Sequence, residues 1–575
     1  MALATYAHER SDEEMKAIAN AKLNSAQMVK GYGATATPVS ITKATETATY
    51  SIYEGTAGEG FVIVTRNDCY PAVIGYGAGA FDANDLPCCM KWWLDGIDHQ
   101  MAHAPKHAPA HTTRSNYAPV EPFIKSKWGQ EDPFNRKAPQ INGALPPVGC
   151  VATALAQAMN YYQYPKKAKF DSQYYVDDSD EGTDVSVNST YSWPFLDGYG
   201  YYLPEGYTKS EDVIYVEPGR KGALVAQLCI DCAYATYMNF SHKGSGSTVF
   251  YSATALTQCF GYPEACIKHA DRDELNDDDL FREIIYTEIQ RKSPIIMGGH
   301  DDKDGGHAFV LGGMDANGLV HVNWGWNGKY DGYYDIVLMN PPQNDESFST
   351  YQRIVYGIRT TPLETDKPEP RLYSADDKPY TFSFANDKDD AGNKHVSIHI
   401  RFTRGFFNYS PSSFNGEVGL FGTDLTTGKN YVVWETDPLD FKPTYGYFIQ
   451  QPADLFFYYV EQDLIEGHTY RLSFGYRDKI EGQWHGIHCG GKEIAYDVKY
   501  TGDPATCTIS EVKEVLFDGI REVNVKAADD GMTRVYDTTG RLVHTAPTAQ
   551  FNLWDVPARG ILVVKQGNSV KKVVR

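Results

Sequence analysis

The sequence predicts an α+β protein in which a mixed helical and stranded first part is followed by an all-β second part. Up to about residue 362, helical periodicity alternates with short strand patterns. Beyond that point, alternating segments such as VSIHIRF and TYRLSFGY are separated by Gly, Asn and Asp turns, as in antiparallel sheets. The length of 575 residues fits about three to five folding units, at ~100–200 residues each.

Four regions are predicted from changes in pattern along the chain. Residues 1–118 begin with a helical pattern, continue with strands such as Gly60–Val64, and include a second helical stretch, CCMKWWLDGIDHQMAH. They end in HAPKHAPAHTTRSNYAP, which has no apolar periodicity and is typical of an exposed linker open to proteolysis. Residues 119–362 mix long helices with strand pairs, residues 363–502 predict an antiparallel β-sandwich, and residues 503–575 predict a small all-β module.

Composition and charge exclude some classes of function. Hydrophobic residues make up 42% of the chain and charged residues 22%, which is ordinary for globular domains. The net charge of −21 argues against a nucleic-acid partner, because phosphate contacts need clustered Lys and Arg. The sequence has no apolar run long enough for a transmembrane helix. It opens MALATYAHERSDEEMKAIANAKL without the apolar core of a signal peptide, so we expect a cytoplasmic protein or an exported one whose signal peptide is absent from this chain.

The ten Cys do not show the paired CxxC spacing of a zinc site. Cys229 and Cys232 form a lone CxxC inside the apolar run ALVAQLCIDCAYATYMNF. We interpret them as buried helix residues rather than as redox or metal-binding residues. We expect no metal and no cofactor, and the sequence leaves disulfide pairing open.

The segment VGCVATALAQAMNYYQYP predicts a helix with Cys150 at its N-terminus. Small or apolar residues recur from Val151 at positions 151, 154, 155, 158, 159 and 162, which lie on one face of a helix. Proline and glycine break regular structure before the helix, and Pro165 lies beyond its end. Unpaired N–H groups and the helix dipole at such an N-terminus favour the thiolate, the reactive form of cysteine. The alternative is a small buried residue at a helix start.

A thiolate nucleophile needs a general acid–base, and the candidate is His307 in GGHAFVLGGMDANGLVHVNWGWNGKYDGYY. His307 starts an apolar strand, an Asn-Gly turn follows, and a partner strand returns as a hairpin. We expect the hairpin to bring Asn323 and Trp324 near His307, where Asn323 would accept the imidazole N–H and Trp324 would shield that bond from water. His321 is the competing histidine, but its alternation with two valines predicts that it points to the other face of the strand.

Gln130, in KWGQEDPFN, is the candidate oxyanion donor. Its side-chain N–H would act alongside the backbone N–H of Cys150 on the charge that develops during acyl transfer. Taken alone, Gln130 is an exposed loop residue.

These segments resemble a known family. WGQEDPFN, GCVATALAQAMNYYQYP, GGHAFV and HVNWGW are similar to the motifs of the streptopain family of papain-fold cysteine peptidases, over roughly residues 45–362. The resemblance implies a papain-like catalytic domain at residues 119–362 and an inhibitory α+β propeptide at residues 1–118. It makes Cys150 the nucleophile and His307 the base. It further implies that Asn323 and Trp324 orient the histidine and that Gln130 donates to the oxyanion.

The resemblance also extends to residues around the cleft. GFVIVTRNDCYPAVIGYGAGAFDAND is similar to the family's propeptide, in which a loop plugs the active site. The plug residues here would be Phe81, Asp82 and Asn84, and activation would cut the linker near residues 112–122. The GSGS stretch is similar to the wall that binds the non-primed side of a substrate, and the loop 298–306 to its mobile rim. The implied substrate-binding residues are Ser245, Gly246, Ser247, Gly305 and Gly306. Val148 and Asn327 depart from the family pattern, where Thr and Gly are frequent, and leave substrate details open.

The last module, with RVYDTTGRLV and LWDVPARGILVVKQGNSVKKVVR, resembles the C-terminal sorting domain of Bacteroidota type IX secretion. This resemblance implies a secreted or cell-surface protein whose C-terminal domain interacts with a secretion machinery. Its alternative is a generic β-hairpin module. The β-sandwich before it resembles accessory domains of such proteins, which serve for spacing or protein binding.

Three functions remain as hypotheses at this point. The first is a secreted cysteine endopeptidase, made as a zymogen, with protein and peptide substrates and its own propeptide as inhibitor. The second is a surface protein that binds or recruits other proteins on a peptidase scaffold. The third is transglutaminase-type acyl transfer, which uses the same Cys–His chemistry with an amine as acceptor.

Overall fold

The structure is a computed structural model that falls into two compact units, residues 1–515 and 516–575, which are described separately. The described residues are 8–25, 39–56, 58–102, 118–193, 220–275, 278–301, 305–336, 352–375, 381–388, 394–402, 404–448, 453–457, 464–489, 492–503, 506–515, 532–537, 542–547, 561–566 and 569–574. The linker 103–117, which contains much of the predicted cleavage region, lies outside them.

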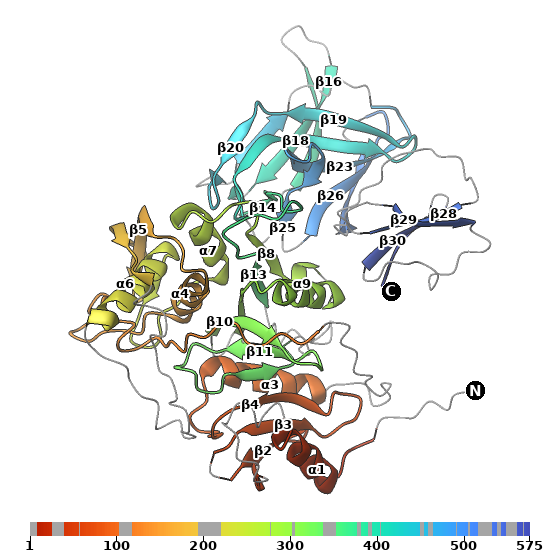
Figure 1. Cartoon of the computed structure of the whole chain (residues 1–575). Helices are drawn as coiled ribbons and strands as arrows, with labels where there is room; N and C mark the ends of the chain where they lie inside the picture. Colours follow the sequence, from red (N-terminus) through yellow and green to blue (C-terminus); the bar gives the residue numbers. More distant parts are fainter. Residues whose placement is uncertain are drawn as a thin grey trace. The chain divides into compact units, whose positions relative to one another are not determined.

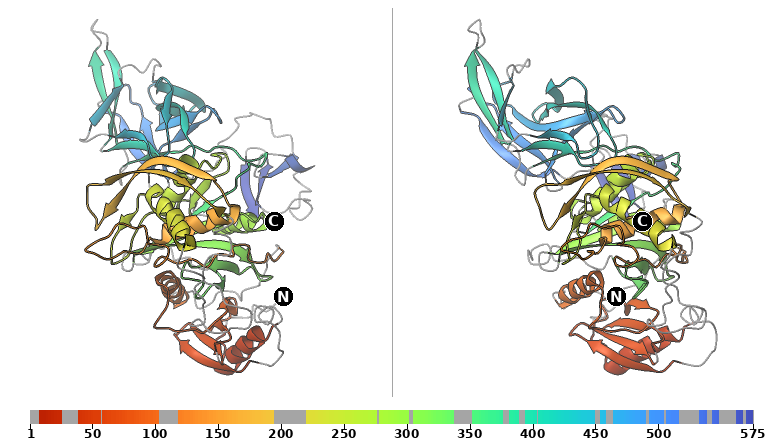
Figure 2. Two further views of the ribbon diagram at one scale, coloured as in Figure 1. Left: turned by 60° about the vertical axis from the view of Figure 1, so that its left-hand side comes forward. Right: turned by 90° about the vertical axis from the view of Figure 1, so that its left-hand side faces the viewer.

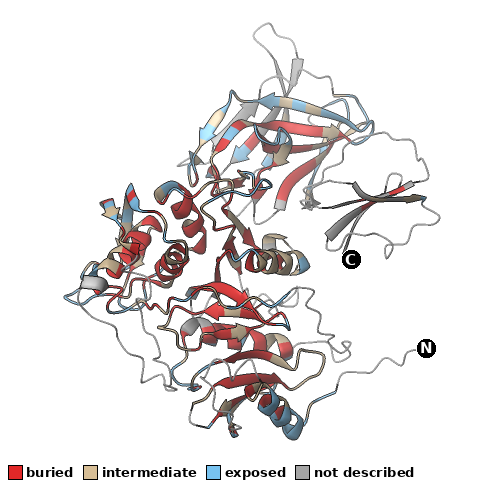
Figure 3. Ribbon diagram, in the orientation of Figure 1, coloured by how far each residue is buried: buried red, intermediate tan, exposed pale blue. Residues whose placement is uncertain are grey.

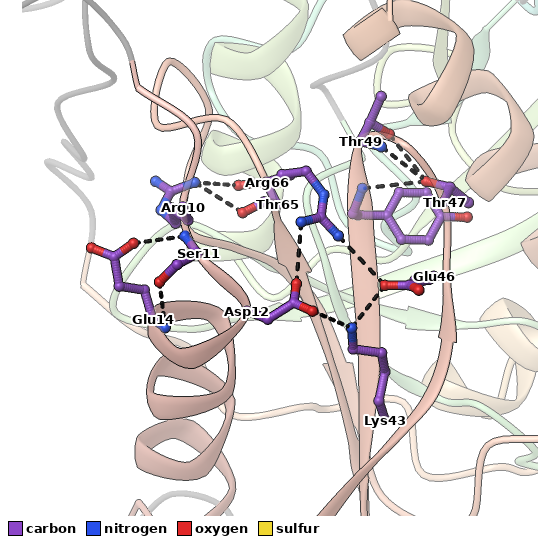
Figure 4. A network of polar contacts seen from close by, with 11 residues as sticks. Arg10, Ser11, Asp12, Glu14, Lys43, Glu46, Thr47, Thr49, Thr65 and Arg66 are labelled. Carbon is purple, nitrogen blue, oxygen red and sulfur yellow. Dashed lines mark hydrogen bonds and ion pairs between the residues drawn. The ribbon is translucent and has the colours of Figure 1, made fainter.

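The first hundred residues form a small α+β domain (Figure 1). Its helices and strands are α1 (Asp12–Leu23), β1 (Ile41–Glu46), β2 (Tyr50–Gly55), β3 (Phe61–Thr65), β4 (Val73–Gly77) and α3 (Cys88–Ala102). Helix α1 begins with a capping box, in which Ser11 and Glu14 satisfy each other's backbone N–H groups. Asp12, at the start of α1, forms ion pairs with Lys43 at 3.0 Å and with Arg66 at 3.2 Å (Figure 4). These contacts fix the start of α1 against β1 and the end of β3.

Residues 119–362 combine helices with mostly antiparallel strands. The helices are α4 (Cys150–Tyr162), α6 (Arg220–Ala235), α7 (Val249–Thr254), the π-helix η2 (Ala255–Cys259), α8 (Arg272–Leu275) and α9 (Asp278–Gln290). The strands are β5 (Lys167–Val176), β6 (Thr183–Thr190), β7 (Asn239–Phe240), β8 (Lys268–Asp271), β9 (Ile295–Asp301), β10 (Gly305–Met314), β11 (Val320–Asn323), β12 (Gly332–Tyr334) and β13 (Arg353–Tyr356).

A single ten-stranded sheet runs through both of these regions. Its order is β1-β2-β3-β4-β12-β11-β10-β9-β13-β8, so the N-terminal strands continue the sheet of the following domain (Figure 1). The junction is antiparallel, with Gly77 opposite Gly332 and Gly75 opposite Tyr334. The N-terminal domain therefore attaches by adding strands at the β12 edge, where main-chain hydrogen bonds supply the contact.

Helices cover both faces of this sheet and create separate cores, whose buried residues appear in red in Figure 3. One core packs α4 and α6 against residues such as Ala308 and Val310 of β10. The other packs α3 against Phe309 and Leu311 of the same strand. This alternation along β10 follows from the two-residue period of a strand.

The bounds of helix α4 were predicted correctly, but the extent of its burial was not. The sequence pattern predicts one apolar face, whereas every residue from Val151 to Met159 is buried. Thr153 and Gln157, both polar, are among them and hydrogen bond to neighbouring segments. The helix is therefore central to the domain, with protein on all sides.

The lone CxxC motif is part of α6, as predicted. Cys229 and Cys232 are fully buried, and burial raises the pKa of each thiol far above its ordinary value. Cys232 contacts the sulfur of Met159 at 3.7 Å. They are packing residues.

Residues 363–515 form an all-β domain with two sheets. An eleven-stranded sheet follows the order β19-β18-β23-β26-β25-β14-β17-β21 with β20, β24 and β27 attached, and a three-stranded sheet follows β15-β16-β22. Their strands are β14 (Leu372–Ser374), β15 (Thr381–Lys388), β16 (Lys394–Phe402), β17 (Gly405–Asn408), β18 (Phe414–Asp424), β19 (Lys429–Glu435), β20 (Leu439–Phe441), β21 (Gly446–Phe448), β22 (Ala453–Phe457), β23 (Thr469–Asp478), β24 (Trp484–Gly486), β25 (His488–Cys489), β26 (Lys492–Lys499) and β27 (Thr508–Val515).

The end of this domain differs from the boundary predicted at residues 502 and 503. Strand β27 lies beyond that boundary, yet it pairs with β26 over Thr508–Val515. Ile400 of the small sheet packs in the same core as the large sheet. The domain therefore extends to Val515, because the sheet continues where the sequence suggests a break.

The all-β domain docks closely on the preceding one. Tyr409 stacks on Phe250 of α7 with ring centroids 3.8 Å apart, and its carbonyl lies 2.8 Å from Nε2 of His269. Glu264 accepts hydrogen bonds from the backbone and hydroxyl of Ser413. Figure 2 shows the two domains adjoining in both views. These contacts indicate a packed interface between the two domains, because domains joined only by a flexible linker would not require them.

We expect acid to weaken this interface through His269. Burial, with a smaller contribution from Arg371, lowers the pKa of His269 to about 3, whereas an unfolded histidine titrates near 6.5. Between these values only the unfolded chain binds the proton, so stability falls as the pH drops below 6.5, by at most about 1.4 kcal/mol per pH unit. Thermal midpoints measured from pH 7 to 4 should fall less steeply for His269→Gln than for the wild type. Equal slopes would contradict the assignment.

The C-terminal unit contains one antiparallel sheet of order β29-β28-β30-β31. Its strands are β28 (Met532–Asp537), β29 (Leu542–Pro547), β30 (Ile561–Gln566) and β31 (Ser569–Val574). The strands predicted at Arg534–Tyr536 and Ile561–Lys565 are confirmed. Among the described helices of the whole chain, none is long and apolar enough to cross a membrane.

Candidate active site

Cys150 is the first residue of α4, as the sequence predicts. Gly149 precedes it with φ 99°, a conformation that favours glycine. A side chain at this position would also approach Met238 to within 2.5 Å. The sharp turn that presents Cys150 therefore requires glycine.

The Cys150 sulfur lies beside β10. The backbone N–H of Ala308, the residue that follows His307, interacts with the thiol, as do the N–H groups of Val151 and Cys150 itself. Burial raises the pKa of the Cys150 thiol, and these N–H groups offset only part of that rise. The helix N-terminus was expected to favour the thiolate, but in this structure burial outweighs it and the neutral thiol is preferred.

His307 lies in β10 opposite Gly299 of β9. The period of the strand places its side chain on the face of Phe309, whereas Cys150 packs with Ala308 on the other face. Helix α3 covers the His307 face: a Cβ at Gly299 would lie 2.2 Å from the ring of Trp92. The structure thus brings the two residues to the same stretch of β10, with the N-terminal domain packed on the histidine side.

Asn323 contacts a different set of groups from those predicted. It pairs with Val310 in the hairpin, not with His307. Its Oδ1 accepts from Gln157 Nε2 at 3.1 Å and from the Gly325 N–H at 3.0 Å, and its Nδ2 donates to the Ser126 carbonyl at 2.7 Å. The hairpin register, which sequence does not reveal, directs Asn323 to these groups. The Asn323–imidazole bond stays a prediction.

Trp324 is fully buried on the face of the sheet that carries Phe309. Its ring lies 4.9 Å from that of Phe309 and 5.2 Å from that of Tyr334, and Nε1 donates to the Tyr330 carbonyl at 3.1 Å. By the two-residue period of β10, His307 projects to this same face, and the shielding role of Trp324 stays a prediction.

His321, the competing histidine, is held in its neutral form. Burial lowers the pKa of His321 to about 3, and Lys125 and Lys127 contribute in the same direction. Its ring packs edge-on against Tyr333 with centroids 5.2 Å apart. A base with so low a pKa accepts protons poorly near neutral pH, which argues against His321 as the base.

Gln130 lies next to the segment that leads into Cys150. Its carbonyl accepts the Val148 N–H at 2.8 Å, and the preceding Gly129 carbonyl accepts the Thr153 hydroxyl at 3.2 Å. The stretch 126–130 is thereby fixed along the first turns of α4. Gln130 therefore lies beside the segment that leads into Cys150, and its role as oxyanion donor stays a prediction.

The predicted substrate wall also borders Cys150. Ser245 is buried and its hydroxyl donates to the Pro147 carbonyl, while Gly246 exchanges two backbone hydrogen bonds with Asn239. The hydroxyl of Ser247 donates to the Thr236 carbonyl. At the start of β10, Gly305 and Gly306 pair with Asp301 and His300 of β9.

The loop that contains the predicted plug contacts a neighbouring segment. Phe81 is buried with its ring 6.1 Å from that of Tyr330, whose hydroxyl donates to the Asp82 carbonyl at 3.2 Å. Asn84 is exposed, and its N–H bonds to the Asp82 carboxylate at 2.9 Å. The described contacts of this loop hold it on the segment that follows Trp324, and Asn84 itself does not fill a buried cleft.

A second contact joins the N-terminal domain to the hairpin turn between β10 and β11. Lys22 of α1 lies 3.4 Å from the fully buried carboxylate of Asp315, and Tyr76 donates to the same carboxylate at 3.0 Å. Desolvation lowers the pKa of Lys22, and Asp315 opposes that shift. The hairpin that carries His307 and Asn323 is thus held at its turn as well as at its β12 edge.

Comparison with protein families accounts for this organisation. Residues 128–334 match the Peptidase C10 family, and residues 8–101 match the Spi protease inhibitor family. The chain belongs to the Peptidase C10 family. It carries a cysteine peptidase domain preceded by an inhibitor domain, which is the organisation of a zymogen.

Individual relatives agree with the Peptidase C10 assignment. The thiol protease/hemagglutinin PrtT of Porphyromonas gingivalis is 29% identical over 348 residues, and streptopain of Streptococcus pyogenes is 27% identical over 331 residues. The matches cover 56% and 52% of this chain, and 38% and 78% of those proteins. A solved fragment of prointerpain A from Prevotella intermedia is 31% identical, covers 56% of this chain and all of that fragment, and superposes with a TM-score of 0.48.

Two features of the Peptidase C10 site escaped the sequence reasoning. The first is Gln157, a polar residue in the mostly apolar segment GCVATALAQAMNYYQYP whose role was not assigned. The second is the pairing of β4 with β12, for which the glycines at both partner positions were the available indication.

Proposed function

We propose that Cys150 and His307 form the catalytic pair of a secreted endopeptidase that is stored as an inactive precursor. The observation that carries this proposal is the placement of Cys150 at the α4 N-terminus against β10, where the backbone N–H of Ala308, the residue after His307, contacts the thiol. The wall 245–247 and the stretch 126–130 lie on either side of the segment that leads into Cys150. A substrate chain laid across this segment would meet the thiol and the oxyanion donors, and it would meet the base once the His307 side chain has turned to the face of β10 on which Cys150 packs.

The chemistry follows the order of acyl transfer. The Cys150 thiolate attacks the carbonyl carbon of the scissile bond, and the N–H groups of Gln130 and Cys150 stabilise the oxyanion. His307 then gives its proton to the leaving amine, which departs and leaves a thioester. Water, deprotonated by His307, hydrolyses the thioester and restores the thiol. No metal or cofactor takes part in these steps.

Activation would separate the N-terminal domain from the peptidase. Residues 1–118 are proposed as the propeptide and residues 119–362 as the catalytic domain, with cleavage in the linker near 112–122. In the precursor, α3 packs on the His307 face and burial keeps the Cys150 pKa high. Departure of α3 and β4 frees the histidine side of β10. An imidazolium beside the sulfur would then lower the thiol pKa.

The location of the mature protein is a separate part of the proposal. The module 503–575, corrected at its start to about 516, resembles a type IX sorting domain and contains the antiparallel hairpin of β28 and β29. This supports secretion or attachment at the cell surface, with the secretion machinery as a partner. The all-β domain at 363–515 would travel with the peptidase.

Labelling with an epoxysuccinyl probe tests the proposal. We expect the processed wild type to label at Cys150 and the precursor to label much more slowly, because the precursor disfavours the thiolate. Cys150→Ala should lose the label, whereas Cys69→Ala, a partly buried cysteine of the propeptide, should label as the wild type after processing. If neither form of the wild type labels, the chain is better described as a binding protein on a peptidase scaffold.

A further inference from the structure

A buried pair of side-chain amides joins the helix of Cys150 to the strand that ends at Asn323. Gln157 lies about two turns beyond Cys150 in α4, and it is 1% exposed. Its Nε2 donates to Asn323 Oδ1 at 3.1 Å, and Asn323 Nδ2 donates back to Gln157 Oε1 at 3.1 Å. The two amides thus exchange two hydrogen bonds between α4 and β11.

The same amide oxygen also holds the stretch that leads to Gln130. Gln157 Oε1 accepts from the Ser126 hydroxyl at 3.0 Å and from the Trp128 N–H at 3.3 Å. Asn323 reaches this stretch as well, through its 2.7 Å bond to the Ser126 carbonyl. One side chain therefore connects three segments that are far apart in the sequence.

Each of these segments has one end at a residue with a role in the proposed reaction. Helix α4 begins at Cys150, the stretch 126–130 ends at Gln130, and β11 continues into Trp324 beside the histidine face. The amide pair lies in the interior, where polar groups with all partners satisfied form rigid networks. A small shift at Gln157 would move all three groups relative to one another.

We propose that Gln157 is a positioning residue that sets the distances between Cys150, the Gln130 stretch and the end of β11. It touches no substrate and acts through Asn323, Ser126 and Trp128. The inference rests on the proposed peptidase function and adds to it the element that aligns the site. Asn323 then serves as the partner of Gln157 in this structure.

The first test replaces Gln157 by methionine, which keeps the length of the side chain and removes its hydrogen bonds. Rates of peptide hydrolysis are measured on the processed protein and divided by the concentration of sites titrated with an epoxysuccinyl probe. We expect kcat about 10- to 100-fold lower with KM within about twofold, because a misplacement of ~1 Å costs on the order of 10²-fold in rate. Gln227→Met is the matched control, since the bond that Gln227 makes among the described residues lies within α6, to Asp231.

The second test exchanges the two amides. Gln157→Asn and Asn323→Gln each change the pair by one methylene and should lower kcat, whereas the double variant restores its total length and should recover part of kcat and of the thermal midpoint. A Gln157→Met protein with wild-type kcat would overturn the inference, as would a double variant that regains its thermal midpoint without regaining kcat. A wild type that hydrolyses nothing would instead overturn the proposed function, and this inference with it.

Discussion

Cys150→Ala is expected to abolish peptide hydrolysis and to leave the full-length precursor as a single stable band. The sulfur forms the first new bond of the reaction. Its loss should lower the rate by roughly 10³-fold or more, which leaves only the rate acceleration that substrate binding and the oxyanion donors provide. Processing should stop as well, because the linker is proposed to be cut by the enzyme itself. The measurement is a time course of the purified precursor, followed by gel electrophoresis and by hydrolysis of a peptide.

Two controls make the Cys150→Ala result decisive. Cys259→Ala removes a partly buried sulfur of η2 and should process as the wild type does. Addition of processed wild-type enzyme to Cys150→Ala shows whether one molecule can cut another. If the isolated variant is trimmed to the wild-type size without added enzyme, self-processing is ruled out.

Gly332→Ala is expected to loosen the propeptide and to speed activation. A Cβ at Gly332 would lie 2.3 Å from the Tyr76 carbonyl oxygen and 2.8 Å from the Cα of Gly77, both in the backbone of β4. Overpacking of this kind costs about 1–3 kcal/mol, which converts to roughly 5- to 150-fold in the equilibrium between the docked and released propeptide. The rate at which activity appears in fresh precursor should rise accordingly.

The processed enzyme provides the control for Gly332→Ala. Tyr76 and Gly77 leave with the propeptide, so the clash is absent and kcat/KM should stay within about twofold of the wild type. Asp315→Asn offers an independent comparison, because it weakens the contact of Lys22 and Tyr76 with the hairpin turn without altering β12. Unchanged activation in Gly332→Ala would mean that strand pairing at β12 does not limit release.

The local parts of the site were predictable because short-range chemistry determines them. Gly149 and the two prolines before it interrupt regular secondary structure, and the small residues that follow favour a helix. Cys150 was therefore expected to be the first residue of α4, as it is. Asp315 accepts the N–H groups of Asn317 and Leu319, and Gly318 adopts φ 85°, so the turn of the hairpin was also readable.

The partners across the hairpin were not predictable. The sequence suggested that Asn323 returns to His307, yet the register pairs it with Val310 and directs its amide to Gln157 and Ser126. A strand pattern repeats every two residues, so it specifies the face of a side chain better than its partner on the next strand. The exposure of Asn84 has a similar origin, since a loop motif does not say which surface the loop meets.

The sequence by itself determined the positions of Cys150 and His307, the helix and hairpin that carry them, and the succession of mixed and all-β regions. Only the tertiary structure decided that β4 extends the peptidase sheet at β12, that α3 packs on the histidine face, and that Gln157 links the site together. The first set depends on residues that are neighbours in the chain. The second depends on contacts between distant segments, which compete with many alternatives and are selected only when the whole core is packed.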